Sequence, residues 1–442
     1  MALGAMLLDT VAMKINKIII RNLFHRYNYE LELINNNKTS VIYGYNGFGK
    51  TTILKIITAI LNFDYELLDK IIFDEVVIVF SNFDVSKELK VINVNSDNIK
   101  FRYIYDKENY DVKFQKTEII SKISGKKKVL KNYIDNPNLK DIFNKDLIQT
   151  AYYISADRIY RYYDGNFGKN LSSCIKQAQH DINSTISSIY SNARDSYLLT
   201  RNTKIVPREE LIKTSRMIGA LRKNGWINRL IVSETNIDLI DSICNKNINE
   251  LSYKEEKFLN KWYQRISGLF DNPKFMIVEL FINILNDNFF GIGNKRVGID
   301  GHRIKMIYFN DDFPYFPIKV KDNDNIPLDS LSSAEKNLFV LFYELIFKLK
   351  ERKLVMIDEP EISLHIYAQE RILDVIDSIV NYDIDSINNY FKKNTGLSQK
   401  DFKRRIVNDF VPLYGVQVLI ATHSPNICKN HEENMIELKS LQ

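Results

Sequence analysis

Cysteine is scarce in this sequence of 442 residues, and the three that occur, Cys174, Cys244 and Cys428, lie far apart without the spacing of metal ligands. This argues against a disulfide framework and indicates reduced thiols in a reducing compartment, so we expect a cytoplasmic protein. Long apolar runs are also missing, because the runs at 276–285 and 338–349 are interrupted by Glu or Asn before the roughly 18 residues that a membrane span needs. We therefore expect no membrane passage.

Neither sign of charge dominates. The chain has 61 basic and 55 acidic residues and a formal net charge of +6, an excess that we interpret as spread along the whole sequence. Such a balance permits contact with nucleic acid without indicating it. The sequence has no internal repeat, low-complexity tract or long heptad pattern. Its 45% hydrophobic content is that of a soluble globular protein with one large or two moderate cores.

The first part of the chain changes pattern at about residue 13. Residues 1–12 are apolar, lack a basic leader and include Asp9, which argues against a secretory signal. We therefore interpret them as an extension or a cloning remnant outside the fold. Short β-branched and aromatic runs at 18–21, 29–33 and 40–43 predict strands that lead into a glycine loop.

Helical and strand-like patterns alternate after that loop. The apolar spacing of 51–61 predicts a buried helix, and 76–105 returns to strand-like stretches. After about residue 163, apolar residues recur every three or four positions, as on one face of a helix. These residues are Ile175, Ala178, Ile182, Ile186, Ile189 and Ala193. Further helical patterns continue to about residue 288.

Strand-like patterns return at 295–327, with a turn at Gly301, and then alternate with helices to the C-terminus. We therefore predict an α/β fold with a mainly parallel core sheet and an additional antiparallel β portion. Its head is expected to consist of residues 13–165 and 296–442, with a helical insertion at 166–295 between the two parts.

A glycine-rich loop lies between the predicted strand at 40–43 and the helix that follows. Its sequence is Gly44-Tyr-Asn46-Gly47-Phe-Gly49-Lys50-Thr51-Thr52, which contains the eight-residue P-loop pattern. Backbone N–H groups of such a loop, with the positive end of the helix dipole, bind the phosphates of ATP. We expect Lys50 to reach the β and γ phosphates and the Thr51 hydroxyl to bind Mg²⁺. Gly47 and Gly49 leave room for close approach of the backbone. The alternative is a glycine turn at the end of a strand.

A second motif is the apolar run 354–357, which predicts a buried strand and ends abruptly in Asp358-Glu359-Pro360-Glu361. Carboxylates at the carboxyl end of a buried parallel strand lie where ligands bind in α/β sheets. We expect Asp358 to hold Mg²⁺ through water and Glu359 to act as the general base for the attacking water. A strand that ends in solvated acids is the alternative.

The segment 331–337, Leu-Ser-Ser-Ala-Glu-Lys-Asn, precedes an apolar-faced helix. Ser332 and Glu335 have the spacing of a capping box, so this helix N-terminus offers unpaired donors to an anion. The segment resembles the signature motif of ABC ATPases, in the form used by the SMC and RecF branch, except that Ala334 replaces a glycine. The resemblance implies that Ser332, Ser333 and Glu335 face ATP bound by a second copy, in a head-to-head dimer. A helix cap alone is the alternative.

A further buried-strand pattern at 416–421 is followed by Thr422-His423-Ser424-Pro425. In ABC ATPases a histidine at the end of this strand contacts the γ-phosphate and orders the catalytic water, and the resemblance implies this role for His423. A histidine with a purely structural role is the alternative. The segment 361–365 resembles the D-loop of the DNA-repair and defence branch.

Two weaker signals remain in the first half of the chain. Phe24, His25 and Tyr27 are candidates for stacking on adenine, with core packing as the alternative. Residues 154–158, which end in Arg158, resemble a strand end of related ATPases, with a surface ion pair as the alternative.

Four motifs in this order resemble the AAA-15 and AAA-21 branch of ABC ATPases. This branch includes OLD-family nucleases and the stand-alone ATPases of Septu-like and PARIS-like antiphage systems. The resemblance covers residues 13–165 and 300–442 and implies an ATPase in which Lys50, Glu359 and His423 are catalytic. Because the sequence shows no acidic cluster or His-Asn pattern that makes a convincing nuclease, we expect no nuclease activity from this chain alone.

Three functions fit this resemblance. The first is an ATPase that senses infection and controls a separate effector, such as a nuclease, in antiphage defence. The second is a RecF-like DNA-repair ATPase that binds DNA. The third is a nucleotide-locked oligomeric scaffold with little turnover, which Ala334 favours. The expected partners are a second copy of the chain and a separate effector protein.

Overall fold

The structure of this chain is a computed structural model. It describes residues 13–33, 39–81, 86–94, 96, 99–105, 107–120, 127–134, 137–145, 150–156, 172–200, 250–270, 272–290, 295–300, 303–308, 326–349, 354–380, 416–429 and 431–439, with the single positions 211, 214, 218, 221, 226 and 243. The expected extension at 1–12 and the candidate Arg158 lie outside the described residues.

One layer of the molecule is a five-stranded sheet with the strand order β14-β3-β13-β12-β9. Its strands are β3 (Ser40–Tyr43), β9 (Ala151–Ile154), β12 (Leu354–Asp358), β13 (Val418–Thr422) and β14 (Met435–Glu437). Every neighbouring pair is parallel. The carboxyl ends of β3, β12 and β13 therefore meet at one edge of the sheet, where the P-loop, the acidic motif and His423 follow them.

The central strands of this sheet are wholly apolar up to their ends because both faces are covered. In β12, Leu354 and Met356 lie in one hydrophobic core, whereas Val355 and Ile357 lie in another. The residues of β13 alternate in the same way. Such double burial explains why these strands have continuous apolar runs in the sequence instead of an alternating pattern.

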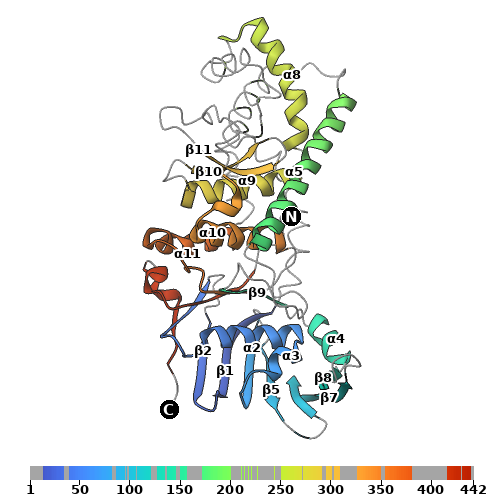
Figure 1. Cartoon of the computed structure of the whole chain (residues 1–442), viewed down its shortest axis with the longest axis vertical. Helices are drawn as coiled ribbons and strands as arrows, with labels where there is room; N and C mark the ends of the chain where they lie inside the picture. Colours follow the sequence, from blue (N-terminus) through green and yellow to red (C-terminus); the bar gives the residue numbers. More distant parts are fainter. Residues whose placement is uncertain are drawn as a thin grey trace.

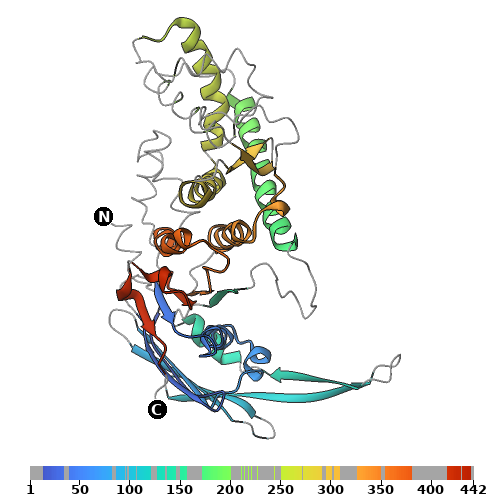
Figure 2. The ribbon, with the colours of Figure 1, turned by 60° about the vertical axis from the view of Figure 1, so that its left-hand side comes forward.

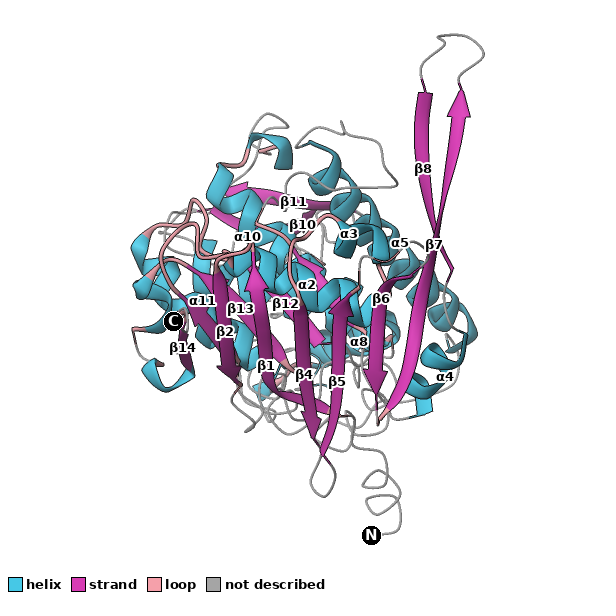
Figure 3. Cartoon of the chain, turned by 90° about the horizontal axis from the view of Figure 1, so that it is seen from below, coloured by secondary structure: helices cyan, strands magenta, loops and turns pink. Residues whose placement is uncertain are grey.

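A second sheet contains seven strands in the order β2-β1-β4-β5-β6-β7-β8, and each neighbouring pair is antiparallel. Its strands are β1 (Lys14–Leu23), β2 (Tyr27–Glu32), β4 (Glu75–Ser81), β5 (Ser86–Asn93), β6 (Ile99–Tyr105), β7 (Glu108–Ile120) and β8 (Lys127–Ile134). Seen from below, β7 and β8 extend well beyond the other strands (Figure 3).

Helix α2 (Lys50–Asn62) packs between the two sheets (Figure 1). Its buried face, including Ile53, Ile56 and Ile60, shares one core with β1 and β4 and with Leu354 and Met356 of the parallel sheet. The helix that begins at the P-loop is therefore fixed by apolar contacts on two sides, and this places the loop at the carboxyl edge of the parallel sheet.

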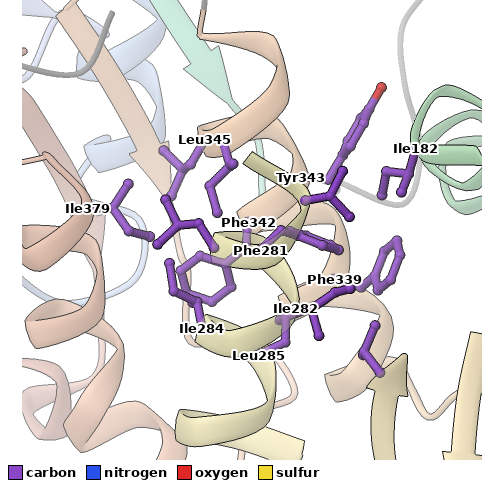
Figure 4. Close-up of a cluster of buried hydrophobic side chains, with 14 of the residues drawn as sticks. Ile182, Phe281, Ile282, Ile284, Leu285, Phe339, Phe342, Tyr343, Leu345 and Ile379 are labelled. Carbon is purple, nitrogen blue, oxygen red and sulfur yellow. The ribbon is translucent and has the colours of Figure 1, made fainter. Parts of the chain in front are cut away.

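The opposite face of the parallel sheet is covered by helices. These are α5 (Ser172–Thr200), α9 (Pro273–Leu285), α10 (Ser333–Tyr343) and α11 (Ile366–Val380), with α8 (Tyr253–Phe270) packed on α5. In their shared core Phe281 meets Phe339 edge to face, with 5.1 Å between ring centroids, and Figure 4 shows these rings among Leu285, Phe342 and Ile379. This second core joins the helices to the sheet.

The remaining elements are short. They are α3 (Tyr65–Asp69), α4 (Pro137–Lys145), β10 (Lys295–Asp300), β11 (Arg303–Tyr308), the 3-10 turns at Leu328–Ser330, Pro425–Cys428 and Glu432–Asn434, and π-helical turns at Asn286–Phe290 and Glu344–Lys348. In Figure 2 the seven-stranded sheet lies at one end of an elongated molecule, and α5 and α8 reach toward the other end.

The predicted α/β fold, with a parallel sheet and an antiparallel sheet, is confirmed. The predicted apolar face from Ile175 to Ala193 is confirmed as well, because all six of its residues are buried along α5. The strands predicted around Gly301 are β10 and β11, which form a two-stranded antiparallel sheet. The domain boundaries stay predictions. Within the described residues, no helix is long and apolar enough to cross a membrane.

Candidate nucleotide-binding site

The P-loop connects β3 to α2, as its sequence predicts. Gly47 and Gly49 have φ angles of +86° and +80°, in the left-handed region that favours glycine. Gly49 is also the N-cap residue of α2, and a Cβ atom there would lie 3.2 Å from Cδ2 of Leu23. The backbone therefore turns sharply in front of the helix N-terminus, which is the arrangement that binds phosphate groups. Asn46 is exposed at the tip of this loop.

Lys50 is buried at the start of α2, with only 5% of its surface exposed. Its Nζ atom donates hydrogen bonds to the carbonyl oxygens of Gly44, at 2.7 Å, and Tyr45, at 3.0 Å. Burial lowers the pKa of the ammonium group, and the carboxylates of Glu359 and Asp358 oppose this shift. The cation is therefore held inside the loop curvature and faces the acidic end of β12.

Thr51 and Asp358 lie together although 307 positions separate them in the sequence. The Thr51 hydroxyl donates to Oδ1 of Asp358 at 3.0 Å, and the Tyr153 hydroxyl donates to Oδ2 at 3.0 Å. Burial raises the pKa of Asp358, whereas these two hydrogen bonds favour its charged form. The sequence argument placed Thr51 and Asp358 at one site but missed Tyr153, which lies on the neighbouring strand β9.

Oxygen ligands of this kind suit Mg²⁺, which prefers carboxylates, hydroxyls and water. A hydroxyl and a carboxylate oxygen 3.0 Å apart can both face one ion, with phosphate oxygens and water as its other ligands. The residues present therefore fit the expected role of Thr51 and Asp358 in holding Mg²⁺ beside ATP. Thr52, the next residue, is half-buried in the first turn of α2.

Glu359 and His423 leave adjacent strands at the same level. Asp358 pairs with Ala421 in the sheet, and the backbone N–H of Glu359 donates to the Ala421 carbonyl at 2.8 Å. Glu359 has a φ of +43°, an uncommon conformation for a residue with a side chain. Its Oε1 atom lies 3.3 Å from Nδ1 of His423. The two residues expected to act on the attacking water are therefore in contact.

Glu361 is a functional candidate to which the sequence argument gave no role. It is 3% exposed, and its Oε1 atom accepts hydrogen bonds from the Thr422 hydroxyl and from the His423 backbone N–H. The same oxygen lies 3.6 Å from Nδ1 of His423. Burial raises the pKa of this carboxyl group, and the bond from Thr422 opposes the shift. Its position in the acidic motif was the signal that could have identified it.

The signature segment forms the N-terminus of α10 as a complete capping box. The Ser332 hydroxyl accepts from the Glu335 backbone N–H, and Glu335 accepts from the Ser332 backbone N–H at 2.8 Å. Ser332 and Ser333 are exposed. Farther along the helix, Asn337 donates to the Ile362 carbonyl at 3.1 Å, which ties α10 to the predicted D-loop. This helix end therefore presents donors on the molecular surface.

The aromatic candidates for adenine stacking have different surroundings. Phe24 is 42% exposed in the turn between β1 and β2, where both Phe24 and His25 have positive φ. Tyr27 packs on Phe48 of the P-loop, with ring centroids 5.9 Å apart. Their role in adenine binding stays a prediction, and Phe24 has the exposure that stacking on a ligand requires.

Comparisons with known proteins place this geometry in a family. The sequence matches none of the curated proteins with which it was compared. Among solved structures, an Smc head domain from Pyrococcus furiosus, bound to the C-terminal domain of ScpA, is 13% identical, with 97% of this chain and 94% of that chain covered and a TM-score of 0.40. The recombination mediator RecF with ATP is also 13% identical, with 96% of both chains covered and a TM-score of 0.27. The family model described as an AAA ATPase domain matches residues 13–428, and this chain therefore belongs to that family, AAA_15.

Proposed function

We propose that this ATPase hydrolyses ATP at composite sites, each of which forms when two copies of the chain meet head to head. One copy supplies the P-loop, Asp358, Glu359 and His423, and the other supplies the N-terminus of α10. The observation that carries the nucleotide half of the proposal is the hydrogen bond between Thr51 and Asp358, because it joins the phosphate loop to the acidic strand end at one edge of the sheet.

Each side chain of the site has a distinct chemical task. Lys50 and the backbone N–H groups of the P-loop offset the negative charge of the β and γ phosphates. Thr51 and Asp358 hold Mg²⁺, which supplies electrostatic stabilisation to the phosphate oxygens when bound. Glu359 accepts a proton from the water that attacks the γ-phosphate. His423 lies 3.3 Å from the Glu359 carboxylate and holds that carboxylate in its orientation.

The second copy is required because the signature donors lie on the surface. Ser332 and Ser333 are exposed, and the capping box leaves other N–H groups of the first turn of α10 for an anion. A γ-phosphate bound by a partner copy is an anion that these exposed N–H donors at the N-terminus of α10 could bind. ATP would therefore act as a bridging ligand between two copies of the chain.

The test is Mg²⁺-dependent ATP hydrolysis by the purified chain over a range of protein concentrations. Composite sites predict a rate per molecule that rises with concentration, because the dimer is the active species. Glu359→Gln is the control for contaminating activity, and its rate should fall about 100-fold or more, since general base catalysis contributes at least that factor. A rate per molecule that is independent of concentration, although the variant is inactive, would contradict the composite site.

We assign the cycle of this ATPase to the control of a separate effector, such as a nuclease, in antiphage defence. The support is the likeness of the motif set to the stand-alone ATPases of Septu-like and PARIS-like systems. Cells that carry the gene with its neighbours should resist phage, and Glu359→Gln should remove that protection in plaque assays. Resistance that persists in the variant, or an ATPase that never associates with a protein encoded beside it, would contradict this role.

A scaffold that binds ATP with little turnover is the second candidate, and Ala334 favours it. Its methyl group occupies the signature position at which the family has glycine. There it reduces the space that is available to the phosphate of the second copy. Tight ATP binding and dimer formation without hydrolysis would support the scaffold. Brisk hydrolysis that Glu359→Gln abolishes would exclude it.

A further inference from the structure

Strands β7 and β8 continue beyond the seven-stranded sheet as a separate ribbon. The pairing of β7 with β6 runs from Glu108 to Lys113, whereas its pairing with β8 begins at Lys113 and continues to Ile120. Past Lys113, β7 therefore has β8 as its neighbour and no longer pairs with β6. Figure 3 shows these two strands extending away from the body. We call residues 114–120 and 127–133 the basic ribbon.

The base of this ribbon is fixed to the domain. The ring of Tyr133 packs against Tyr65 of α3, with centroids 6.1 Å apart. Lys100 and Asp69 form an ion pair of 3.0 Å that is largely shielded from solvent, so that α3 is linked to the neighbouring strand β6. At about 3.4 Å per residue, the seven residues of β7 in the ribbon span roughly 24 Å. The ribbon is therefore anchored at its base and projects from the seven-stranded sheet.

The segment that contains the ribbon is strongly basic. Residues 113–134 contain seven lysines and one acidic residue, and this surplus of six equals the formal net charge of +6 of the whole chain. A segment of this charge attracts a polyanion, although residues 201–229 carry an equal surplus, with eight basic and two acidic residues.

The register places two lysine positions opposite each other in the ribbon. Lys116 is directly opposite Lys131 in the antiparallel ladder, and such a pair of like charges destabilises a hairpin. Lys127 and Lys128 lie on the same strand as Lys131, and Glu118 is the single acid of the ribbon. Lysines also protect free strand edges from aggregation, which is the structural alternative to a binding role. A negatively charged partner would in addition offset the repulsion between the opposed lysines.

We propose that the basic ribbon binds the sugar–phosphate backbone of duplex DNA. A two-stranded ribbon fits the major groove, which is about 12 Å wide, and its lysine positions would place positive charge between the two rows of phosphates. Contacts of this kind are independent of base sequence and release condensed counterions. The surface is separate from the nucleotide site, so its role does not depend on the proposed ATP hydrolysis.

The proposal is tested by fluorescence anisotropy with a labelled mixed-sequence DNA duplex of about 30 base pairs, titrated with the full chain at several salt concentrations. The test variant changes Lys116, Lys127, Lys128 and Lys131 to Gln. The matched control changes the same number of exposed lysines on α8 and α9, Lys254, Lys257, Lys261 and Lys274, to Gln. A second control replaces the four ribbon lysines with Arg, which keeps the charge. Circular dichroism and thermal unfolding show whether each variant is folded.

The wild type, the Arg variant and the α8–α9 variant should bind the duplex with a strong dependence on salt. The ribbon variant should bind at least about tenfold more weakly, and the slope of log K against log salt should be smaller in magnitude by about 3 to 4, since each lost phosphate contact removes about 0.9. Equal losses in the ribbon and α8–α9 variants would overturn the proposal. Binding to polyglutamate that depends on the ribbon lysines, without binding to DNA, would also overturn the proposal. It would show that the ribbon binds an acidic protein.

Discussion

The Nδ1 atom of His423 lies between two carboxylates, 3.3 Å from Oε1 of Glu359 and 3.6 Å from Oε1 of Glu361. Glu361 also accepts the backbone N–H of His423, so it holds the main chain as well as the ring. The histidine expected to face the γ-phosphate is therefore positioned by a buried acid, while the exposed side of the ring is left to ligand and water.

The first prediction concerns Glu361 as a positioning residue. Glu361→Ala removes the acceptor of the Thr422 and His423 bonds, and it should lower kcat about tenfold or more with little change in KM for ATP. Glu361→Gln keeps one acceptor oxygen and should retain most of the rate. Steady-state kinetics of the two variants check this, and equal losses in both would contradict positioning through that oxygen.

The second prediction concerns the two glycines of the P-loop. Gly47→Ala and Gly49→Ala both force a side chain into positive φ, which costs about 1–2 kcal/mol. A Cβ atom at position 49 would in addition lie 3.2 Å from Cδ2 of Leu23, whereas a Cβ atom at position 47 meets no atom within 4 Å. Gly49→Ala should therefore lower the free energy of unfolding more than Gly47→Ala, as measured by urea denaturation without nucleotide. Equal effects would show that Leu23 moves aside freely.

The third prediction concerns the alanine in the signature segment. Ala334→Gly should increase the rate of ATP hydrolysis severalfold at a protein concentration that limits dimer formation, because it removes a methyl group from the approach of the phosphate. The same change should cost about 0.5–1 kcal/mol of stability, since Ala334 lies in the first turn of α10 and packs on its core. Ala334→Val provides the opposite change and should slow hydrolysis. Equal rates of ATP hydrolysis with alanine, glycine and valine at position 334 would show that the methyl group does not obstruct the phosphate.

The fourth prediction concerns the pH dependence of stability at Asp358. Burial raises its pKa, so the folded state disfavours the charged form, and the wild type loses stability as pH rises from the ordinary value of 3.8 through the raised value. Asp358→Asn removes that loss. The variant should gain stability over the wild type at high pH and lose this advantage toward low pH, by about 1.4 kcal/mol for each unit of pKa shift.

Urea denaturation of Asp358→Asn and the wild type, in parallel at a series of pH values, measures this difference. Lys55→Gln is a suitable control, because it changes a charge near the site without removing the buried acid. A stability difference between Asp358→Asn and the wild type that stays constant over pH would contradict the prediction. The same Asp358 variant should also lose the Mg²⁺ dependence of ATP binding, which isothermal titration can show.

The sequence was sufficient to predict the parts of this fold that have a strong local signal. The glycine at position 47 is required by a positive φ angle. The apolar run before Asp358 is required by burial on both faces of the sheet, and the helical period from Ile175 to Ala193 by burial of one helix face. The α2 helix between the two sheets was predicted as buried because its apolar residues recur with a helical period.

The sequence could not predict contacts that depend on which strands become neighbours. Tyr153 reaches Asp358 only because β9 pairs with β12, and no local pattern marks that pairing. The amide of Gln417 exchanges hydrogen bonds with the backbone of Ile15 across 402 positions, which also depends on tertiary packing. The extension of β7 and β8 was missed because lysine-rich strands with few apolar residues give no clear period of two.

The place of β3 in the parallel sheet has a consequence during protein synthesis. The neighbours of β3 are β13 and β14, which end at Thr422 and Glu437, so the strand that carries the P-loop has no sheet partner until these two strands have left the ribosome. At about 5–20 residues per second, the interval between translation of Thr51 and of Glu437 is roughly 20 to 80 s. A nascent chain therefore cannot assemble the nucleotide site, and cannot enter the ATP cycle, before β13 and β14 have been synthesised.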